Sequence, residues 1–258
     1  MNKMLIAITR RVSSSVNQCE LTHLERIPID LKRARFQHHA YEESLRSLGV
    51  KVHSLPEEPN LPDSVFVEDT AIVLDDCALL TRPGVDSRHP EIESIARALA
   101  PYRQLFTIQA PGTLDGGDVL TVGKTIYVGL SSRSNQAAIN QMQEFLKPFD
   151  YTVKGIQVTG CLHLKSAVTQ VRADMLLINP AWVYKGNFPG MKLIEIDPSE
   201  HYAANALMVG NTVLYQPVYS RTRARLEAEG INLLLVDETE LGKAEGALTC
   251  CALIFSAS

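Results

Sequence analysis

Five short polar clusters along the chain carry residues that can do chemistry, and each cluster directly precedes an apolar run. In chain order the clusters hold Glu68 and Asp69, Asp115 and Asp118, His163 and Lys165, Asn205, and Cys250. A cysteine thiolate is a nucleophile, and a histidine can protonate a leaving amine and later activate water. A carboxylate beside the histidine fixes its tautomer, and further carboxylates favour a cationic substrate. If the clusters meet in one cleft, they predict covalent catalysis on a planar cation such as a guanidinium.

Each of these residues also has a purely structural interpretation. Cys250 and Cys251 lie in an apolar terminal segment, where cysteine often fills a core. A lone histidine such as His163 is usually a hydrogen-bonded structural residue, and acidic pairs before apolar runs often belong to turns. The catalytic interpretation therefore depends on all of the clusters occupying the same position of one repeated unit.

The repeated unit is a polar cluster followed by two apolar strands and a tight turn. Complete hairpins are predicted at 66–81, 114–130, 162–179 and 203–217, with turns at 75–76, 123–124, 172–174 and 210–211. A fifth unit is split between residues 247–256 and 4–9. Helical patterns lie between the hairpins at 37–49, 90–102, 131–149 and 222–231.

The units recur about every 40–50 residues, which is typical of radial or stacked arrays. We therefore predict one α/β domain spanning residues 1–258. Its five units surround a pseudo-fivefold axis, and one unit is shared by the two ends of the chain. An ordinary mixed α/β sandwich built from hairpins fits the pattern equally well.

Composition excludes several classes of protein. The 258-residue chain has a net charge of -4 and no basic stripe, so we expect no nucleic-acid partner. No stretch approaches the roughly 20 apolar residues of a membrane span, and the N-terminus lacks a secretory signal, so we expect a cytoplasmic protein. The five cysteines form no CxxC pair, and HExxH is absent, so we expect free thiols and no metal site.

Four motifs together carry a resemblance to a known family. At FVEDTAIV (66–73), TLDGGDVL (113–120), LHLKSA (162–167) and EGALTCC (245–251), the chain resembles the dimethylarginine dimethylaminohydrolases. These enzymes belong to the guanidine-modifying, or amidinotransferase, superfamily. The resemblance covers nearly the whole chain, and it implies a five-bladed α/β propeller, the pentein fold.

The resemblance also implies roles for individual residues. Cys250 matches the nucleophile, His163 the general acid and base, and Asp115 the carboxylate that supports the histidine. Asp69 matches the residue that binds the guanidinium. The segment 13–26 loosely matches a mobile loop over the site. The implied substrate-binding residues are Leu21 and Ala244 through their backbone carbonyls, Asp63, Glu68 and Asp69 as acidic contacts, and Arg88 and Arg133 as partners of the substrate carboxylate.

The resulting hypothesis is hydrolysis of asymmetric dimethylarginine or monomethylarginine to citrulline and dimethylamine or methylamine. It requires no metal or organic cofactor, only a small-molecule substrate, and it suits a monomer or a homodimer. One alternative is a hydrolase or deiminase that acts on another free guanidine amino acid such as arginine. An alternative of another class is a non-catalytic protein that binds methylarginine.

Overall fold

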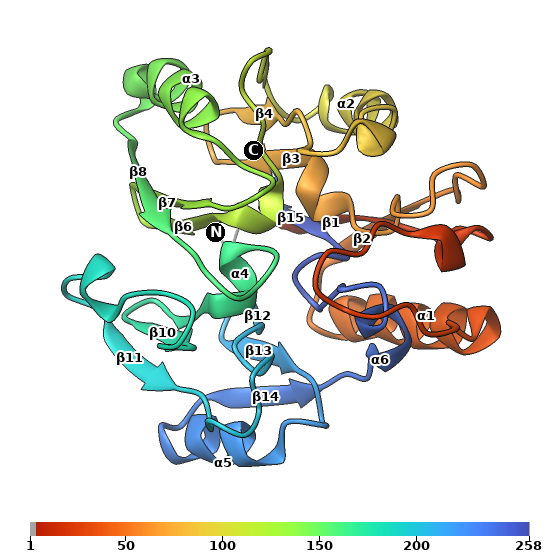
Figure 1. Ribbon diagram of the computed structural model, residues 1–258, viewed down its shortest axis with the longest axis vertical. Helices are drawn as coiled ribbons and strands as arrows, with labels where there is room; N and C mark the ends of the chain where they lie inside the picture. Colours follow the sequence, from red (N-terminus) through yellow and green to blue (C-terminus); the bar gives the residue numbers. More distant parts are fainter. Residues whose placement is uncertain (1–3, 258) are drawn as a thin grey trace.

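Five three-stranded sheets surround a common centre in the computed structural model, which describes residues 4–257 (Figure 1). The sheets consist of β15 (Leu253–Ser256), β1 (Leu5–Arg10) and β2 (Lys51–Leu55); β3 (Ala71–Val73), β4 (Ala78–Leu80) and β5 (Leu105–Thr107); β6 (Val119–Val122), β7 (Thr125–Leu130) and β8 (Thr152–Gln157); β9 (Val168–Arg172), β10 (Met175–Ile178) and β11 (Lys192–Glu195); and β12 (Leu207–Val209), β13 (Thr212–Tyr215) and β14 (Asn232–Leu235).

Every sheet has the same internal plan. Its first two strands pair antiparallel and its second and third strands pair parallel. The four predicted hairpins are confirmed at their predicted turns. Gly123 and Gly210 each have φ +59°, the left-handed conformation that a tight hairpin turn needs and that glycine adopts without strain. The third strands were not predicted individually.

A parallel third strand needs a crossover connection, and helices provide it in four of the five units. These are α1 (Leu31–Ser47), α2 (Glu91–Leu99), α3 (Gln136–Leu146) and α5 (Ser220–Ala228). The connection from β10 to β11 contains only a short 3₁₀ turn, Lys185–Asn187.

Two predicted helix starts were wrong. Helix α1 begins six residues before the predicted position 37 because the Asp30 side chain accepts a hydrogen bond from the Arg33 amide at 3.0 Å. Helix α3 begins at Gln136, not at 131, because Asn135 caps it through the Ala138 amide.

The first strand of each sheet lies nearest the axis. Strand β9 packs beside β6 and β12, and β15 packs beside β3. Residues of β3, β6, β9, β12 and β15 together line a central cavity of about 230 Å³. The prediction of a ring of five α/β units is therefore confirmed, and the two-layer sandwich is excluded.

The ends of the chain meet in one sheet. Strand β15 pairs antiparallel with β1, which places Ile6 opposite Phe255 and Ile8 opposite Leu253. These four side chains are buried in one apolar cluster with residues of β3, β4 and α2. In residues 4–257 no helix is both long enough and apolar enough to cross a bilayer.

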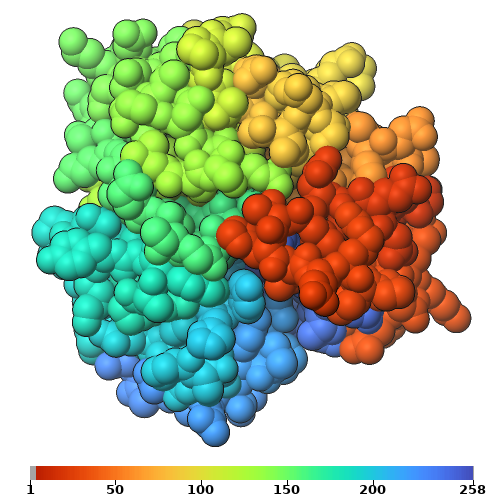
Figure 2. Space-filling model, viewed as in Figure 1, coloured from red at the N-terminus to blue at the C-terminus, as the bar shows by residue number. Residues whose placement is uncertain are grey.

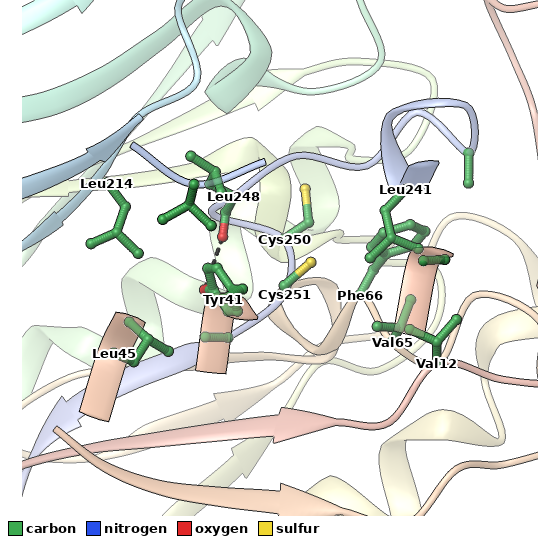
Figure 3. Packing of buried hydrophobic residues seen from close by; sticks show 14 of the residues in the cluster. Val12, Tyr41, Leu45, Val65, Phe66, Leu214, Leu241, Leu248, Cys250 and Cys251 are labelled. Atoms are coloured by element: carbon green, nitrogen blue, oxygen red, sulfur yellow. Dashed lines mark hydrogen bonds between the residues drawn. The ribbon is translucent and has the colours of Figure 1, made fainter. Parts of the chain in front are cut away.

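The turn that carries Cys250 packs on helix α1. Tyr41, Leu45, Leu248, Cys250 and Cys251 belong to one buried cluster (Figure 3). The Tyr41 hydroxyl donates a hydrogen bond of 3.0 Å to the carbonyl of Leu248, and the tyrosine ring has no exposed surface. Helix α1 thus fixes the backbone two residues before the candidate nucleophile.

Replacing Tyr41 with phenylalanine should lower the free energy of unfolding by about 1–3 kcal/mol, because the Leu248 carbonyl would lose its buried donor. The measurement is chemical denaturation monitored by circular dichroism. The matched control is Tyr184→Phe on a side chain that is 76% exposed, which should change the stability very little. Equal stability of both variants would contradict this role for Tyr41.

Candidate active site

Short helical turns bring the five polar clusters to one end of the axis. Helix η2 (Val67–Thr70) precedes β3, η4 (Gly116–Asp118) precedes β6, and α4 (Leu164–Ala167) precedes β9. Non-helical turns hold Asn205 before β12 and Cys250 before β15. Each innermost strand is therefore entered through a turn that carries polar groups, as the repeat pattern predicted.

Hydrogen bonds join every unit to the next, and we call this closed circuit the axial ring. Asp69 accepts from the Gly117 amide at 2.8 Å, and Asp118 accepts from the Leu164 amide at 2.9 Å. Asn205 donates to the Lys165 carbonyl at 3.2 Å and bonds Thr249 at 3.0 Å. The circuit closes where the Thr249 hydroxyl donates to Glu68 at 2.8 Å and the Glu68 amide donates to the Cys250 carbonyl at 3.0 Å.

His163 is held between two carboxylates. Its Nε2 lies 3.0 Å from Asp115 Oδ2, and its Nδ1 lies 3.9 Å from Asp69 Oδ1. Burial alone would lower the pKa of His163, but the negative charge of Asp69 and the hydrogen bond that the ring donates to Asp115 raise it to about 9. The ring packs on Gly117, where an added Cβ would lie 2.5 Å from Nδ1. At neutral pH the site therefore holds an imidazolium in one fixed position.

Cys250 is buried at the same end of the axis. Burial raises the pKa of its thiol, and the charges of Glu68 and Asp69 raise it further. Cys250 shares a small cavity with His163, Asp69 and Arg88. The cavity has room for about 20 Å³ of solvent, enough for roughly one water molecule. In this closed form the thiol is therefore neutral, and an amino acid would fit the cavity only after a rearrangement.

Asp69 and Arg88 form a buried ion pair. Arg88 Nη1 lies 2.6 Å from Asp69 Oδ2, and the same guanidinium bonds Glu91 at 2.8 Å and the Phe66 carbonyl at 3.0 Å. Burial would raise the pKa of Asp69, but the charges of His163 and Arg88 lower it to about 2. Burial raises the pKa of Glu91 to about 7. Asp69 therefore remains ionised beside the thiol.

Most of the predicted site residues share the cavity, but three do not line it. Seven of the ten line it: Asp63, Asp69, Arg88, Arg133, His163, Ala244 and Cys250. Asp115 is fully buried behind His163. Leu21 is not among the lining residues, although its neighbour Glu20 is. Glu68 lines the central cavity instead, and its two oxygens bond Lys165 at 2.5 Å and Thr249 at 2.8 Å.

The segment 13–26 covers the cavity and is bonded to its wall. Figure 2 shows the N-terminal part of the chain, in red, reaching the centre of one face. Glu245 accepts hydrogen bonds from the amides of Thr22, His23 and Leu24, at 3.0, 2.5 and 2.7 Å. Arg133 donates to the Thr22 hydroxyl at 3.0 Å, and the Glu20 amide donates to Asp63 at 3.1 Å.

Sequence reasoning missed five residues of the cavity wall, namely Glu20, Phe66, Leu162, Glu245 and Gly246. Three of them, Glu20, Leu162 and Glu245, are direct neighbours of residues that were predicted. The position of Glu245 depends on a φ of +58°, an uncommon conformation for a residue other than glycine, and the sequence carries no signal for it.

A larger cavity of about 320 Å³ lies beside the small one, and the two share Leu162, Glu245 and Gly246. Neither Cys250 nor His163 lines it. The candidate nucleophile and the candidate acid therefore belong to the small cavity.

Comparison with known proteins gives a consistent picture. Residues 12–179 match a family model described as N,N dimethylarginine dimethylhydrolase, eukaryotic. The chain is 34% identical to the N(G),N(G)-dimethylarginine dimethylaminohydrolase of Pseudomonas aeruginosa, with 88% of this chain and 90% of that protein covered. It is 35% identical to the protein of the same name from Streptomyces coelicolor, with 96% and 95% covered.

Solved structures agree with the sequence matches. The Pseudomonas aeruginosa enzyme, solved as a cysteine-to-serine variant complexed with citrulline, superposes with a TM-score of 0.93 at 32% identity, covering 98% of this chain and 100% of that one. The N-terminal domain of ArgZ, a cyanobacterial arginine dihydrolase, superposes with a TM-score of 0.86 at 18% identity, covering 97% of each chain. At that identity the second match shows the fold alone.

The titration of His163 can be measured directly by NMR. We expect a pKa of about 9 in the native protein, and lower values in Asp69→Asn and Asp115→Asn, because each variant removes a negative charge that favours the imidazolium. Asp174→Asn, which removes an exposed carboxylate paired with Arg172, is the control and should leave the titration unchanged. An ordinary pKa near 6.5 in the native protein would contradict this electrostatic account.

Proposed function

This chain belongs to the dimethylarginine dimethylaminohydrolase family, and on that premise we propose that it hydrolyses asymmetric dimethylarginine and monomethylarginine to citrulline and the corresponding methylated amine. The observation that carries the proposal is the shared cavity of Cys250, His163 and Asp69. It offers a nucleophile, a protonated acid and an ionised carboxylate to one small cation.

The cavity wall offers a partner for each end of an arginine-like substrate. Each Asp69 oxygen accepts one close hydrogen bond in the empty site, from Gly117 and from Arg88. Because a carboxylate oxygen can accept two, both oxygens keep capacity for guanidinium N–H groups. Arg133 would pair with the substrate carboxylate and Asp63 with its ammonium group. We propose that Glu68 does not contact the substrate directly, since it lines the other cavity and bonds Lys165 and Thr249.

Substrate binding would also activate the nucleophile. The bound guanidinium places a positive charge beside Cys250 and so favours loss of its proton to solvent. The thiolate then attacks the guanidinium carbon and forms a C–S bond. His163 donates its proton to the methylated nitrogen, the C–N bond breaks, and the amine departs, leaving a thiouronium on Cys250.

Water completes the reaction. With the amine gone, neutral His163 takes a proton from a water molecule as that water attacks the same carbon. Collapse of the tetrahedral intermediate breaks the C–S bond, its hydroxyl proton passes to solvent, and citrulline and the Cys250 thiolate are released. Asp115 holds the imidazole through Nε2 in both steps, so that Nδ1 faces the cavity side.

Substrate entry requires the covering segment to move. In the closed form, Asp63 is bonded to the Glu20 amide and Arg133 to the Thr22 hydroxyl, so segment 13–26 occupies the groups that the substrate would use. We therefore propose that the segment opens, the substrate takes these partners, and the segment closes again over the reacting groups.

The hypothesis also covers the domain organisation, location, oligomeric state, cofactors and partners of the protein. We propose that residues 1–258 act as a single catalytic domain, in the cytoplasm, as a monomer or homodimer, without a catalytic cofactor and without a membrane or nucleic-acid partner. The axial ring supports the single-domain proposal, because its hydrogen bonds join all five units of one chain.

The direct test is incubation of the purified protein with asymmetric dimethylarginine, with citrulline and dimethylamine both quantified. We expect equimolar products from the native protein and none from Cys250→Ser, since serine is a far weaker nucleophile in the same position. Failure of the folded native protein to release product would overturn the substrate assignment. Turnover of arginine in its place would then identify a different guanidine hydrolase.

Gly117→Ala should lower kcat about a hundredfold or more, because the new Cβ would lie 2.5 Å from His163 Nδ1 and 2.9 Å from Asp69 Oδ1 and would displace both side chains. Steady-state kinetics on dimethylarginine measures the effect. Gly242→Ala is the matched control, because an added Cβ there meets no atom within 4 Å. Normal turnover by Gly117→Ala would show that His163 needs no fixed position.

A further inference from the structure

A second cluster of possible metal ligands lies behind the catalytic turn. His38 comes from helix α1, Glu238 directly precedes α6 (Thr239–Gly242), and Cys251 follows Cys250. One ligand atom from each of the three lies within 4.8 Å of the other two. The side chains are buried, with exposures of 3%, 0% and 0%. None of them lines the catalytic cavity, and the reaction proposed above uses none of them.

His38 and Glu238 lack the hydrogen bonds that buried polar groups normally make, whereas Cys251 Sγ donates to the Ala247 carbonyl at 3.6 Å. Both ring nitrogens of His38 and both carboxylate oxygens of Glu238 have no hydrogen-bond partner. His38 Nδ1 and Glu238 Oε1 are 3.6 Å apart, too far for a hydrogen bond. An unpaired buried carboxylate is costly, so its persistence calls for a compensating group. In contrast, Asp69 in the catalytic cluster is bonded to Arg88 and Gly117.

The donor types and their spacing identify the missing group. Imidazole nitrogen, thiolate sulfur and carboxylate oxygen are the three ligand types that zinc uses in proteins. Two ligands at about 2.0–2.1 Å from a tetrahedral zinc ion are about 3.3 Å apart, close to the observed nitrogen–oxygen separation. We propose that His38, Glu238 and Cys251 bind a Zn²⁺ ion. The second Glu238 oxygen or a water molecule completes the tetrahedron.

Charge balance supports this assignment. Zinc binding releases the Cys251 proton to solvent, and the thiolate together with the Glu238 carboxylate then neutralises the two charges of the ion. A neutral unit is the form that a buried, apolar surrounding tolerates best. The thiolate also disfavours magnesium and calcium, which prefer oxygen ligands.

The surroundings of His38 resemble the outer shell of a metal site. Its Nε2 points toward Glu42 Oε1 at 3.8 Å, and Glu42 is held by Thr9 at 2.6 Å and Arg46 at 3.3 Å. A carboxylate on the far nitrogen orients a histidine ligand and leaves the other nitrogen free for the metal. His38 and Glu42 also line a cavity of about 310 Å³ together with exposed Arg11 and Arg35, which provides a route from the surface.

The ion would tie together three distant parts of the chain, namely α1, the start of α6 and the residue after the candidate nucleophile. A ligand that binds only the folded state stabilises it. We therefore expect the zinc-loaded protein to melt at a higher temperature than the chelator-treated protein.

Cobalt binding in a Cys250→Ser background tests the site, because that variant removes a competing thiolate in the catalytic cavity. After chelator treatment, one equivalent of Co²⁺ should produce a cobalt–thiolate charge-transfer band and the visible bands of a tetrahedral ion, and Zn²⁺ should abolish both. Adding Cys251→Ala should remove the charge-transfer band. Glu238→Gln, which keeps the shape of the side chain, should weaken the affinity at least about tenfold.

Cys77→Ala in the same background is the control, because Cys77 is a fully buried cysteine in a different apolar cluster. It should retain the full cobalt spectrum. Absence of a thiolate band in the folded Cys250→Ser protein would overturn the proposal, and so would a band that survives Cys251→Ala. If Cys251→Ala does not fold, the cobalt affinity of Glu238→Gln decides, and an unchanged value would overturn the proposal.

Discussion

The axial ring of hydrogen bonds is the constraint on which the rest of this structure depends. Each unit of the fold is a small sheet with polar groups at the entrance to its innermost strand, and each unit has at least one of these groups bonded to a partner in the neighbouring unit. Asp69 bonds to the second unit, Asp118 to the third, and Thr249 of the last unit returns to Glu68 of the first. Satisfying these buried groups therefore requires all five units at once, which makes closure of the ring and assembly of the candidate site the same event.

The carboxylates of the axial ring lie in different environments, which shift their pKa values in opposite directions. Asp69 is ionised beside His163 and Arg88, whereas burial raises the pKa of Asp118 to about 6 although two serine hydroxyls bond it. Glu68 bonds Lys165 and lines the central cavity, whereas Asp69 lines the small one. Residues at equivalent positions of the repeat therefore differ in charge state and in the cavity that they line, because their neighbours across the ring differ.

Features that depend on residues close together in the sequence could be predicted, whereas features that depend on distant residues could not. Hairpins and their turns depend on residues within a few positions of each other, and all four complete ones were found. The parallel third strands were missed because their pairing depends on the length of a crossover. Seven of the ten predicted site residues line the small cavity, but Glu68 lines the central one, and its contacts with Lys165 and Thr249 lie 97 and 181 residues away in the chain. His38, Glu238 and Cys251 have no local pattern at all, so only the folded chain brings them together.

The reactivity of the Cys250 thiol and the access of a substrate to its cavity depend on the same charged groups. In the closed form the thiol is neutral, the imidazole is charged, and segment 13–26 holds the polar groups at the rim. A neutral molecule that entered would leave Cys250 protonated, and an anion would meet Asp63, Asp69 and Glu245. On the proposed mechanism, a cation with its own carboxylate and ammonium groups would both replace the partners of the segment and favour the thiolate. The same charges that keep the thiol protonated in the closed form would therefore, on this mechanism, favour the substrate that activates it.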